Sequence, residues 1–119
     1  MKRVAAAALW LASPALAQAG GQATIELTAP AEIREARALH AHIERISGKV
    51  TPCVEKGGDP KTCQCQNADE LAALRRAYEA AVAGHPAWRG RTLFFSNADG
   101  SYAWNISMPG LERALSACP

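Results

Sequence analysis

The four cysteines are the residues of this 119-residue chain whose type and spacing could do chemistry. Cys53, Cys63 and Cys65 lie in one short stretch, TPCVEKGGDPKTCQC, and Cys118 lies near the end of the chain. A Cys-x-Cys pair can bind zinc or copper(I) as thiolates. It can also act as a redox dithiol where a cationic neighbour lowers the thiol pKa. Four cysteines can instead form two disulfides, so the choice depends on the compartment.

The first residues indicate an oxidising compartment. Lys2 and Arg3 precede an apolar run over residues 4–12, which is too short to span a bilayer as a helix. Ala15, Leu16 and Ala17 then form a small-x-small cleavage site. The sequence therefore predicts a signal peptide over residues 1–17, a single domain over residues 18–119, and a periplasmic or secreted location. No later stretch is apolar for long enough to cross a membrane.

An oxidising compartment favours disulfides over thiolates. A bond between Cys63 and Cys65 would close a strained ring, so each is expected to pair with either Cys53 or Cys118. The preferred pairs are Cys53–Cys63 and Cys65–Cys118, and the crossed pairing stays open. Cys118 supports a distant partner, because it continues the apolar line of the last expected helix and so faces inward.

Metal and catalytic sites are not indicated. His40 and His42 lie about 160° apart around one expected helix, so they cannot share an ion there, and His85 lies at a helix end. The sequence contains no Gly-x-Ser-x-Gly, phosphate-binding loop or His-Glu-x-x-His motif. We therefore expect no metal, no cofactor and no enzymatic activity. A thiol-redox or metal-handling protein that uses the Cys-x-Cys pair is the alternative, and a small hydrolase is a third class.

The charge balance argues against nucleic-acid binding. The chain has 13 Lys and Arg against 11 Asp and Glu, and loss of Lys2 and Arg3 with the signal peptide leaves 11 of each. A near-neutral protein lacks the basic surplus that binding to nucleic acid or anionic membranes requires.

Hydrophobic periodicity predicts the elements that position the cysteines. Residues 23–27 alternate as a short strand, and residues 31–47 form a helix with Thr28 as N-cap and Gly48 as C-cap. Residues 51–66 read as a loop. A second helix follows Asn67, which forms a capping box with Glu70, and ends at Gly84.

A hairpin and a last helix complete the expected fold. Strands over residues 91–96 and 101–107 flank a turn at 97–100, and a helix starts at Pro109 with Ser107 as its cap. We predict an α+β fold: a small antiparallel sheet made of the hairpin, with the N-terminal strand as an optional member, packed with three helices and two disulfides.

The hairpin is also where we expect binding. A four-residue loop would place Phe95 opposite Tyr102, and a two-residue Asp-Gly turn would place Phe95 opposite Trp104. Both registers give one core face, made by Leu93, Phe95, Tyr102, Trp104 and Ile106.

Phe94 lies on the other face of the hairpin, which is otherwise polar. An aromatic side chain on a polar face is typical of a contact site. Trp88, Arg89 and Arg91 precede it and could extend the surface, although coverage of both rings by a helix is the simpler interpretation. We therefore predict a small secreted or periplasmic binding protein, of the inhibitor or accessory-factor kind, whose partner is another protein or envelope component.

Overall fold

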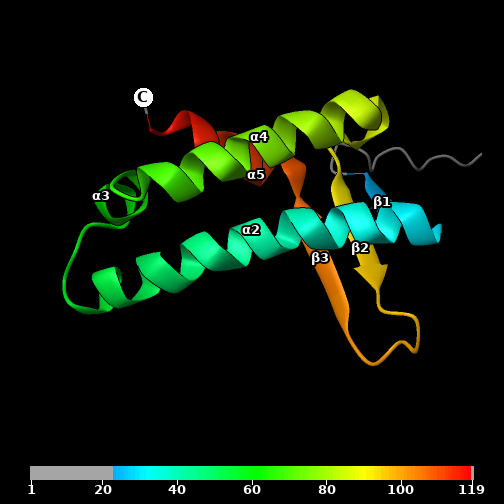
Figure 1. Cartoon of the computed structure of the whole chain (residues 1–119), viewed down its shortest axis with the longest axis horizontal. Helices are drawn as coiled ribbons and strands as arrows, with labels where there is room; N and C mark the ends of the chain where they lie inside the picture. The colour runs from blue at the N-terminus through cyan, green and yellow to red at the C-terminus, as the bar shows by residue number, and fades with distance from the viewer. Residues whose placement is uncertain (1–22, 119) are drawn as a thin grey trace, which may run out of the picture.

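The computed structural model describes residues 23–118, so the predicted signal peptide over residues 1–17 lies outside the described residues. Figure 1 shows the order of the elements along the chain. They are β1 (Thr24–Glu26), α2 (Pro30–Glu55), α3 (Pro60–Cys65), α4 (Ala68–Gly84), the 3-10 turn η4 (Pro86–Trp88), β2 (Thr92–Ser96), β3 (Ala103–Ser107) and α5 (Met108–Ser116). The α+β class with a small sheet is confirmed.

The sheet has the order β1-β2-β3 and is mixed. The N-terminal strand joins it, but β1 runs parallel to β2, whereas β2 and β3 form the antiparallel hairpin. The expectation of a purely antiparallel sheet was therefore wrong. The chain between β1 and β2 contains two long helices, and such a crossover can return the chain to the same end of the sheet, which a tight turn cannot do.

The hairpin register follows the second of the two predicted alternatives. Phe95 lies opposite Trp104, and Leu93 lies opposite Ile106. Leu93, Phe95 and Ile106 are buried, as predicted, and Trp104 is partly buried. Tyr102 was expected in this core face, but it is 67% exposed and lies just outside β3, next to the turn of the hairpin. Figure 1 shows the turn end of the hairpin projecting beyond α2.

Helix α2 is longer than the sequence predicted at both ends. Its N-cap is Ala29 rather than Thr28, and it continues through Gly48 and Pro52 to Glu55. A glycine within a helix costs about 1 kcal/mol and a proline about 3 kcal/mol. Packing of Val50 against the core and the disulfide at Cys53 hold this last part in place and offset the local cost.

The predicted loop over residues 51–66 therefore contains the end of α2 and the short helix α3. Asp59 is the N-cap of α3, where its carboxylate accepts from the backbone N–H of Thr62 at 3.0 Å, and Pro60 is the first helical residue. Both signals were present in the sequence, because a cap residue followed by proline is typical of a helix start.

The last two helices follow the prediction more closely. Asn67 is the N-cap residue of α4, but the capping box was wrong: the Asn67 side chain donates to the carbonyl of Cys63 at 2.7 Å, and Glu70 pairs with Lys49 at 3.0 Å. In α5, the Ser107 hydroxyl accepts from the N–H of Gly110 at 3.1 Å, as its predicted cap role requires.

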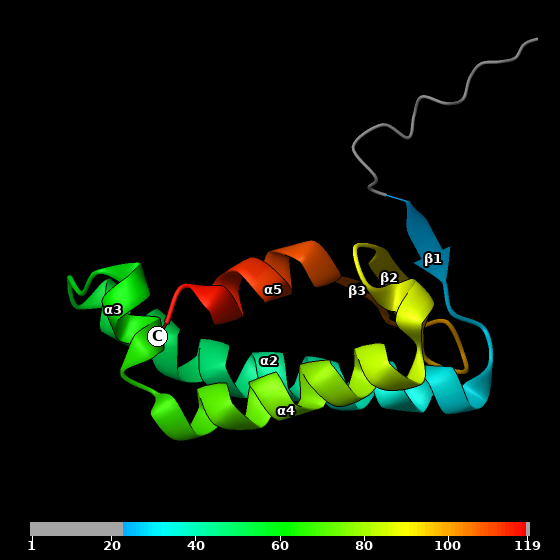
Figure 2. The same ribbon diagram turned by 90° about the horizontal axis from the view of Figure 1, so that it is seen from above.

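One core joins the helices to the inner face of the sheet. Figure 2 shows α2 and α4 running side by side, with α5 across from them. The apolar stripes of these helices meet the inward side chains of the hairpin, and the buried set includes Leu39, Leu74, Trp88, Leu93, Phe95, Met108 and Leu115. No helix within residues 23–118 is long and apolar enough to cross a membrane.

Candidate functional site

Both disulfides match the preferred pairing. Cys53 bonds to Cys63, which we call the short disulfide, and Cys65 bonds to Cys118, which we call the long disulfide. None of the four cysteines is free, so no thiolate is present to ligate a metal or to attack another disulfide. The disulfides indicate an oxidising extracellular or periplasmic environment.

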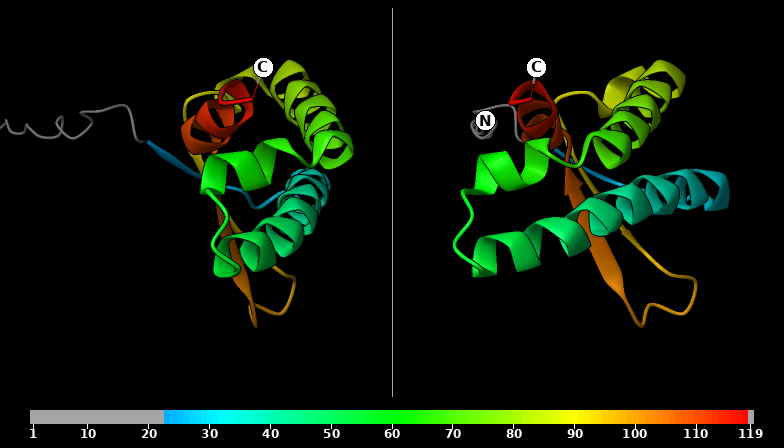
Figure 3. Two further views of the ribbon diagram at one scale, coloured as in Figure 1. Left: turned by 90° about the vertical axis from the view of Figure 1, so that its left-hand side faces the viewer. Right: turned by 60° about the vertical axis from the view of Figure 1, so that its left-hand side comes forward.

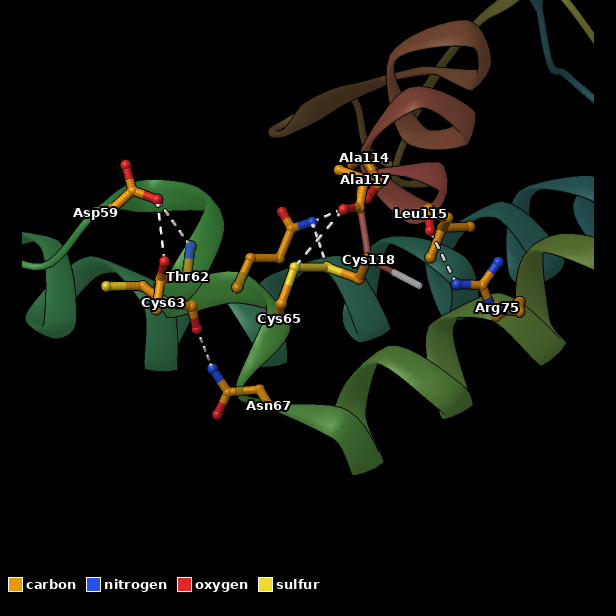
Figure 4. Close-up of a disulfide and its surroundings, with 11 residues drawn as sticks. Asp59, Thr62, Cys63, Cys65, Asn67, Arg75, Ala114, Leu115, Ala117 and Cys118 are labelled. Carbon is orange, nitrogen blue, oxygen red and sulfur yellow. Dashed lines mark hydrogen bonds between the residues drawn. A yellow bond between two sulfur atoms is a disulfide. The ribbon is translucent and has the colours of Figure 1, made fainter.

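The long disulfide lies within a set of contacts that holds the end of α5 (Figure 4). The Gln64 side chain donates to the carbonyl of Ala114 at 2.9 Å, and Arg75 donates to the carbonyl of Leu115 at 2.8 Å. The last carbonyls of a helix have no partner within that helix. Side chains from α3 and α4 therefore complete the C-terminal end of α5, and the disulfide at Cys118 fixes it covalently.

The short disulfide packs against the backbone of Gly58. A Cβ atom at this position would lie 2.5 Å from Sγ of Cys63 and 2.8 Å from Sγ of Cys53. The N–H of Gly58 also donates to the carbonyl of Cys53 at 3.0 Å, which holds the turn against the sulfur atoms. Glycine is required here by close approach, because any side chain would displace the disulfide.

The three histidines have separate partners. His40 lies beside Trp104, with ring centroids 6.3 Å apart. His42 accepts from Arg45 at 2.8 Å, and its pKa is lowered by partial burial and then by the charges of Arg45 and Arg76. His85 pairs with Glu35 and stacks on Trp88.

Because the three histidines lie beside different residues, they do not form a shared metal site. Within residues 23–118, His, Cys, Asp and Glu side chains form no group of three that could hold a metal ion.

The clearest exposed aromatic on a strand is Phe94, on the face of the sheet opposite the core. Side chains alternate along a strand, and paired residues point to the same side. Phe94 lies opposite Glu26 on β1 and Asn105 on β3, so these three form one row across the sheet. We call the surface to which this row belongs the outer face; its members are Thr24, Glu26, Thr92, Phe94, Ser96, Ala103, Asn105 and Ser107.

The outer face is largely exposed. Phe94 itself is 40% exposed, and Glu26 and Asn105 on either side of it are exposed as well. Figure 3 shows the hairpin from two further directions, with α2 crossing it on the side of the core. The sequence placed Phe94 on a polar face, but it could not identify Glu26 as its neighbour, because that depends on the parallel register of β1.

The other predicted binding residues are not grouped with Phe94. Trp88 is only 3% exposed and stacks on His85 with ring centroids 4.1 Å apart, so it belongs to the core. Arg89 pairs with Glu112 on α5 at 3.4 Å. Arg91 is exposed, but it has the opposite phase to Phe94 along the strand direction. A binding role for these residues stays a prediction.

The edge of β3 adds a second feature to the outer face. The N–H of Met108 donates to the carbonyl of Arg91, and the N–H of Asn97 donates to the carbonyl of Tyr102. In an antiparallel pair, hydrogen-bonded positions alternate with positions whose backbone groups point away. The backbone groups of Ala103, Asn105 and Ser107 therefore point away from β2, along the open edge of the sheet.

Comparison with protein-family models, curated proteins and solved structures gives no match for this chain.

Proposed function

We propose that this chain is a small disulfide-tied protein of the periplasm or the extracellular space that binds another protein through the outer face of its sheet. The sequence pattern of residues 1–17 and the two disulfides support the compartment. The near-neutral charge of the mature chain supports a protein partner over a nucleic acid.

The exposure of Phe94 at the centre of the outer face is the observation that carries this proposal. Aromatic side chains are enriched among the residues that dominate binding energy, and a polar surround excludes water from them in the complex. Phe94 has such a surround, since Glu26 and Asn105 flank it on the neighbouring strands and Thr92 and Ser96 lie two residues away on its own.

The open edge of β3 supports the same surface. Its sequence, Ala-Trp-Asn-Ile-Ser, has no charged residue and no proline, which are the usual features that prevent a strand edge from pairing. An extended segment of the partner can therefore add to β3 through the backbone groups of Ala103, Asn105 and Ser107. Its side chains would then continue the row that contains Phe94.

Site-specific photo-crosslinking tests the proposal. A photoreactive phenylalanine analogue replaces Phe94 in one protein and, as a control, Ala83 in another, because Ala83 is exposed on α4. Both mature proteins are irradiated in an extract of the cell envelope and the adducts are identified by mass spectrometry. We expect one defined partner adduct from position 94 and none from position 83.

A variant of the edge strand separates specific contact from random labelling. Asn105→Pro removes an N–H that points away from β2, so it leaves the hairpin ladder intact and blocks strand addition. The adduct at position 94 should be lost in this background. Equal labelling at positions 94 and 83, or an adduct that persists with Asn105→Pro, would contradict the proposed surface.

A further inference from the structure

Other elements pack against helices α2 and α4 on one side only. The two helices run antiparallel, because Lys49 near the end of α2 pairs with Glu70 at the start of α4. At the other end of the pair, Glu35 on α2 meets His85, which follows α4. Figure 2 and Figure 3 show α5 and the sheet on the same side of this helix pair. Within residues 23–118, no helix or strand covers the opposite side, which we call the open side.

A groove of about 560 Å³ runs between α2 and α4 on the open side. Leu39 lies at its base and is only 2% exposed, whereas Ala38 on α2 and Ala80 on α4 are exposed. Most of the lining is small or apolar, and these residues are Ala38, Leu39, Ala77, Ala80, Ala81 and Gly84. An exposed apolar groove is typical of an interaction site, and small side chains allow another helix to approach closely.

Charged side chains of opposite sign flank the two ends of the groove. Glu35 lies one turn before Ala38 on α2, and its side chain is 55% exposed. Arg76 lies one turn before Ala80 on α4 and is also exposed. Because the helices are antiparallel, Glu35 marks one end of the groove and Arg76 marks the other. Arg45 adds to the basic end, since its charge and that of Arg76 both lower the pKa of His42.

This arrangement is complementary to itself. A two-fold axis through the centre of the groove, at Ala38 and Ala80, exchanges the acidic and basic ends, as an interface between identical subunits requires. Glu35 is three residues from Ala38, and Arg76 is four residues from Ala80. At 1.5 Å per residue these offsets are about 4.5 Å and about 6 Å along the helices, so they agree to within about 1.5 Å. Glu35 of one copy would therefore lie opposite Arg76 of a second copy.

We propose that two copies of this chain associate through the α2–α4 groove, as an antiparallel four-helix arrangement in which Glu35 of each copy pairs with Arg76 of the other. Association with the two copies in the same direction is disfavoured, because it would place like charges opposite each other. Charged residues that flank an apolar helix contact set the choice and orientation of the partner in this way. The outer face of the sheet lies on the far side of the molecule from the groove, so the dimer leaves it accessible.

Sedimentation velocity of the mature protein at low ionic strength tests the proposal. The protein is measured from about 5 µM to about 500 µM, since the dimer fraction depends on protomer concentration. We expect the average mass to rise with concentration toward twice the monomer mass. Arg76→Glu should weaken association at least ten-fold. Arg113→Glu is the matched control, because Arg113 is exposed on α5 and does not line the groove, and it should leave association unchanged.

A mixture of two charge-reversal variants identifies the contact. Glu35→Lys should also weaken association at least ten-fold when measured alone. An equimolar mixture of Arg76→Glu and Glu35→Lys should associate at least ten-fold more tightly than either variant by itself, because each variant supplies the charge that the other one needs. Circular dichroism of each variant confirms that the fold is kept, which matters for Glu35→Lys because Glu35 also contacts His85.

Three results would overturn the proposal. The first is a monomer at every concentration. The second is a dimer as stable in Arg76→Glu as in wild type, which would place the contact on another surface. The third is a mixture of folded Arg76→Glu and Glu35→Lys that associates no better than the separate variants. Asn105→Pro, which changes the edge of the sheet, should leave the dimer intact, so the two proposed surfaces are tested separately.

Discussion

Replacing Gly58 with alanine should destabilise the protein by forcing the short disulfide to move. The added Cβ would lie 2.5 Å and 2.8 Å from the two sulfur atoms, and 2.9 Å from the carbonyl oxygen of Cys53. Each distance is well below ordinary van der Waals contact. The backbone cannot retreat without losing the hydrogen bond from the N–H of Gly58 to that carbonyl, which is 3.0 Å long.

The expected cost is about 2 kcal/mol, which is typical of one methyl group forced into a well-packed site. For a domain of this size, such a loss lowers the unfolding temperature by on the order of 10 °C. Gly48→Ala is the matched control, because a Cβ there meets nothing within 4 Å and the residue lies inside α2. It should stabilise the protein by about 0.5–1 kcal/mol through helix propensity. Thermal and urea unfolding of both variants measure the two effects.

A second background identifies the sulfur atoms as the cause. In protein with Cys53→Ala and Cys63→Ala, two of the three close contacts disappear. The unfolding free energy lost through Gly58→Ala should therefore be smaller in this background, by more than the experimental error. A Gly58→Ala protein as stable as wild type would refute the packing argument. An undiminished penalty in the background without sulfur would refute the assignment of the cause.

Three further perturbations test the rest of the fold. Removing the long disulfide by Cys65→Ser with Cys118→Ser should cost about 4 kcal/mol in urea unfolding, and the matching double variant of the short disulfide should cost about 3 kcal/mol. The long disulfide contributes more because its cysteines are 53 residues apart in the sequence, whereas those of the short disulfide are 10 apart. Equal costs would contradict this dependence on loop length. Trp88→Ala should cost about 3–5 kcal/mol, since the ring is buried, and a neutral effect would show that it is not core. Hydrogen bonds from Thr62 hold the pKa of Asp59 below its usual value, so the stability that its carboxylate provides is present above about pH 4 and is lost as the pH falls through the lower folded-state pKa. Urea midpoints between pH 2 and pH 7 should show a smaller acid loss in Asp59→Asn, and an identical pH profile would count against it.

The cysteine pairing and the hairpin were predictable because each depends on a strong local pattern. Cys118 continues the apolar line of α5, and this placed it toward a partner in the inter-helix segment. The alternation through Leu93, Phe94 and Phe95 separated the core face from the outer face whichever register applied. Both patterns, the apolar line of α5 and the alternation along β2, involve residues close together in the sequence, and the structure confirms both.

The errors occurred where tertiary contacts outweigh local preference. Gly48 and Pro52 are strong stop signals, yet α2 continues because its stripe packs on the core and the short disulfide holds its end. The parallel pairing of β1 could not be predicted, since nothing in residues 23–27 indicates their partner strand.

One paired measurement distinguishes a role of Phe94 in recognition from a role in folding. The unfolding free energy of Phe94→Ala and its affinity for the crosslinked partner are measured together, with Tyr102→Ala as the exposed control. We expect a change in stability below about 1 kcal/mol, as for other exposed strand positions, with affinity reduced at least ten-fold for Phe94→Ala and unchanged for Tyr102→Ala. A Phe94→Ala protein that loses several kcal/mol of stability, or that binds the partner as wild type does, would contradict a role of Phe94 in recognition.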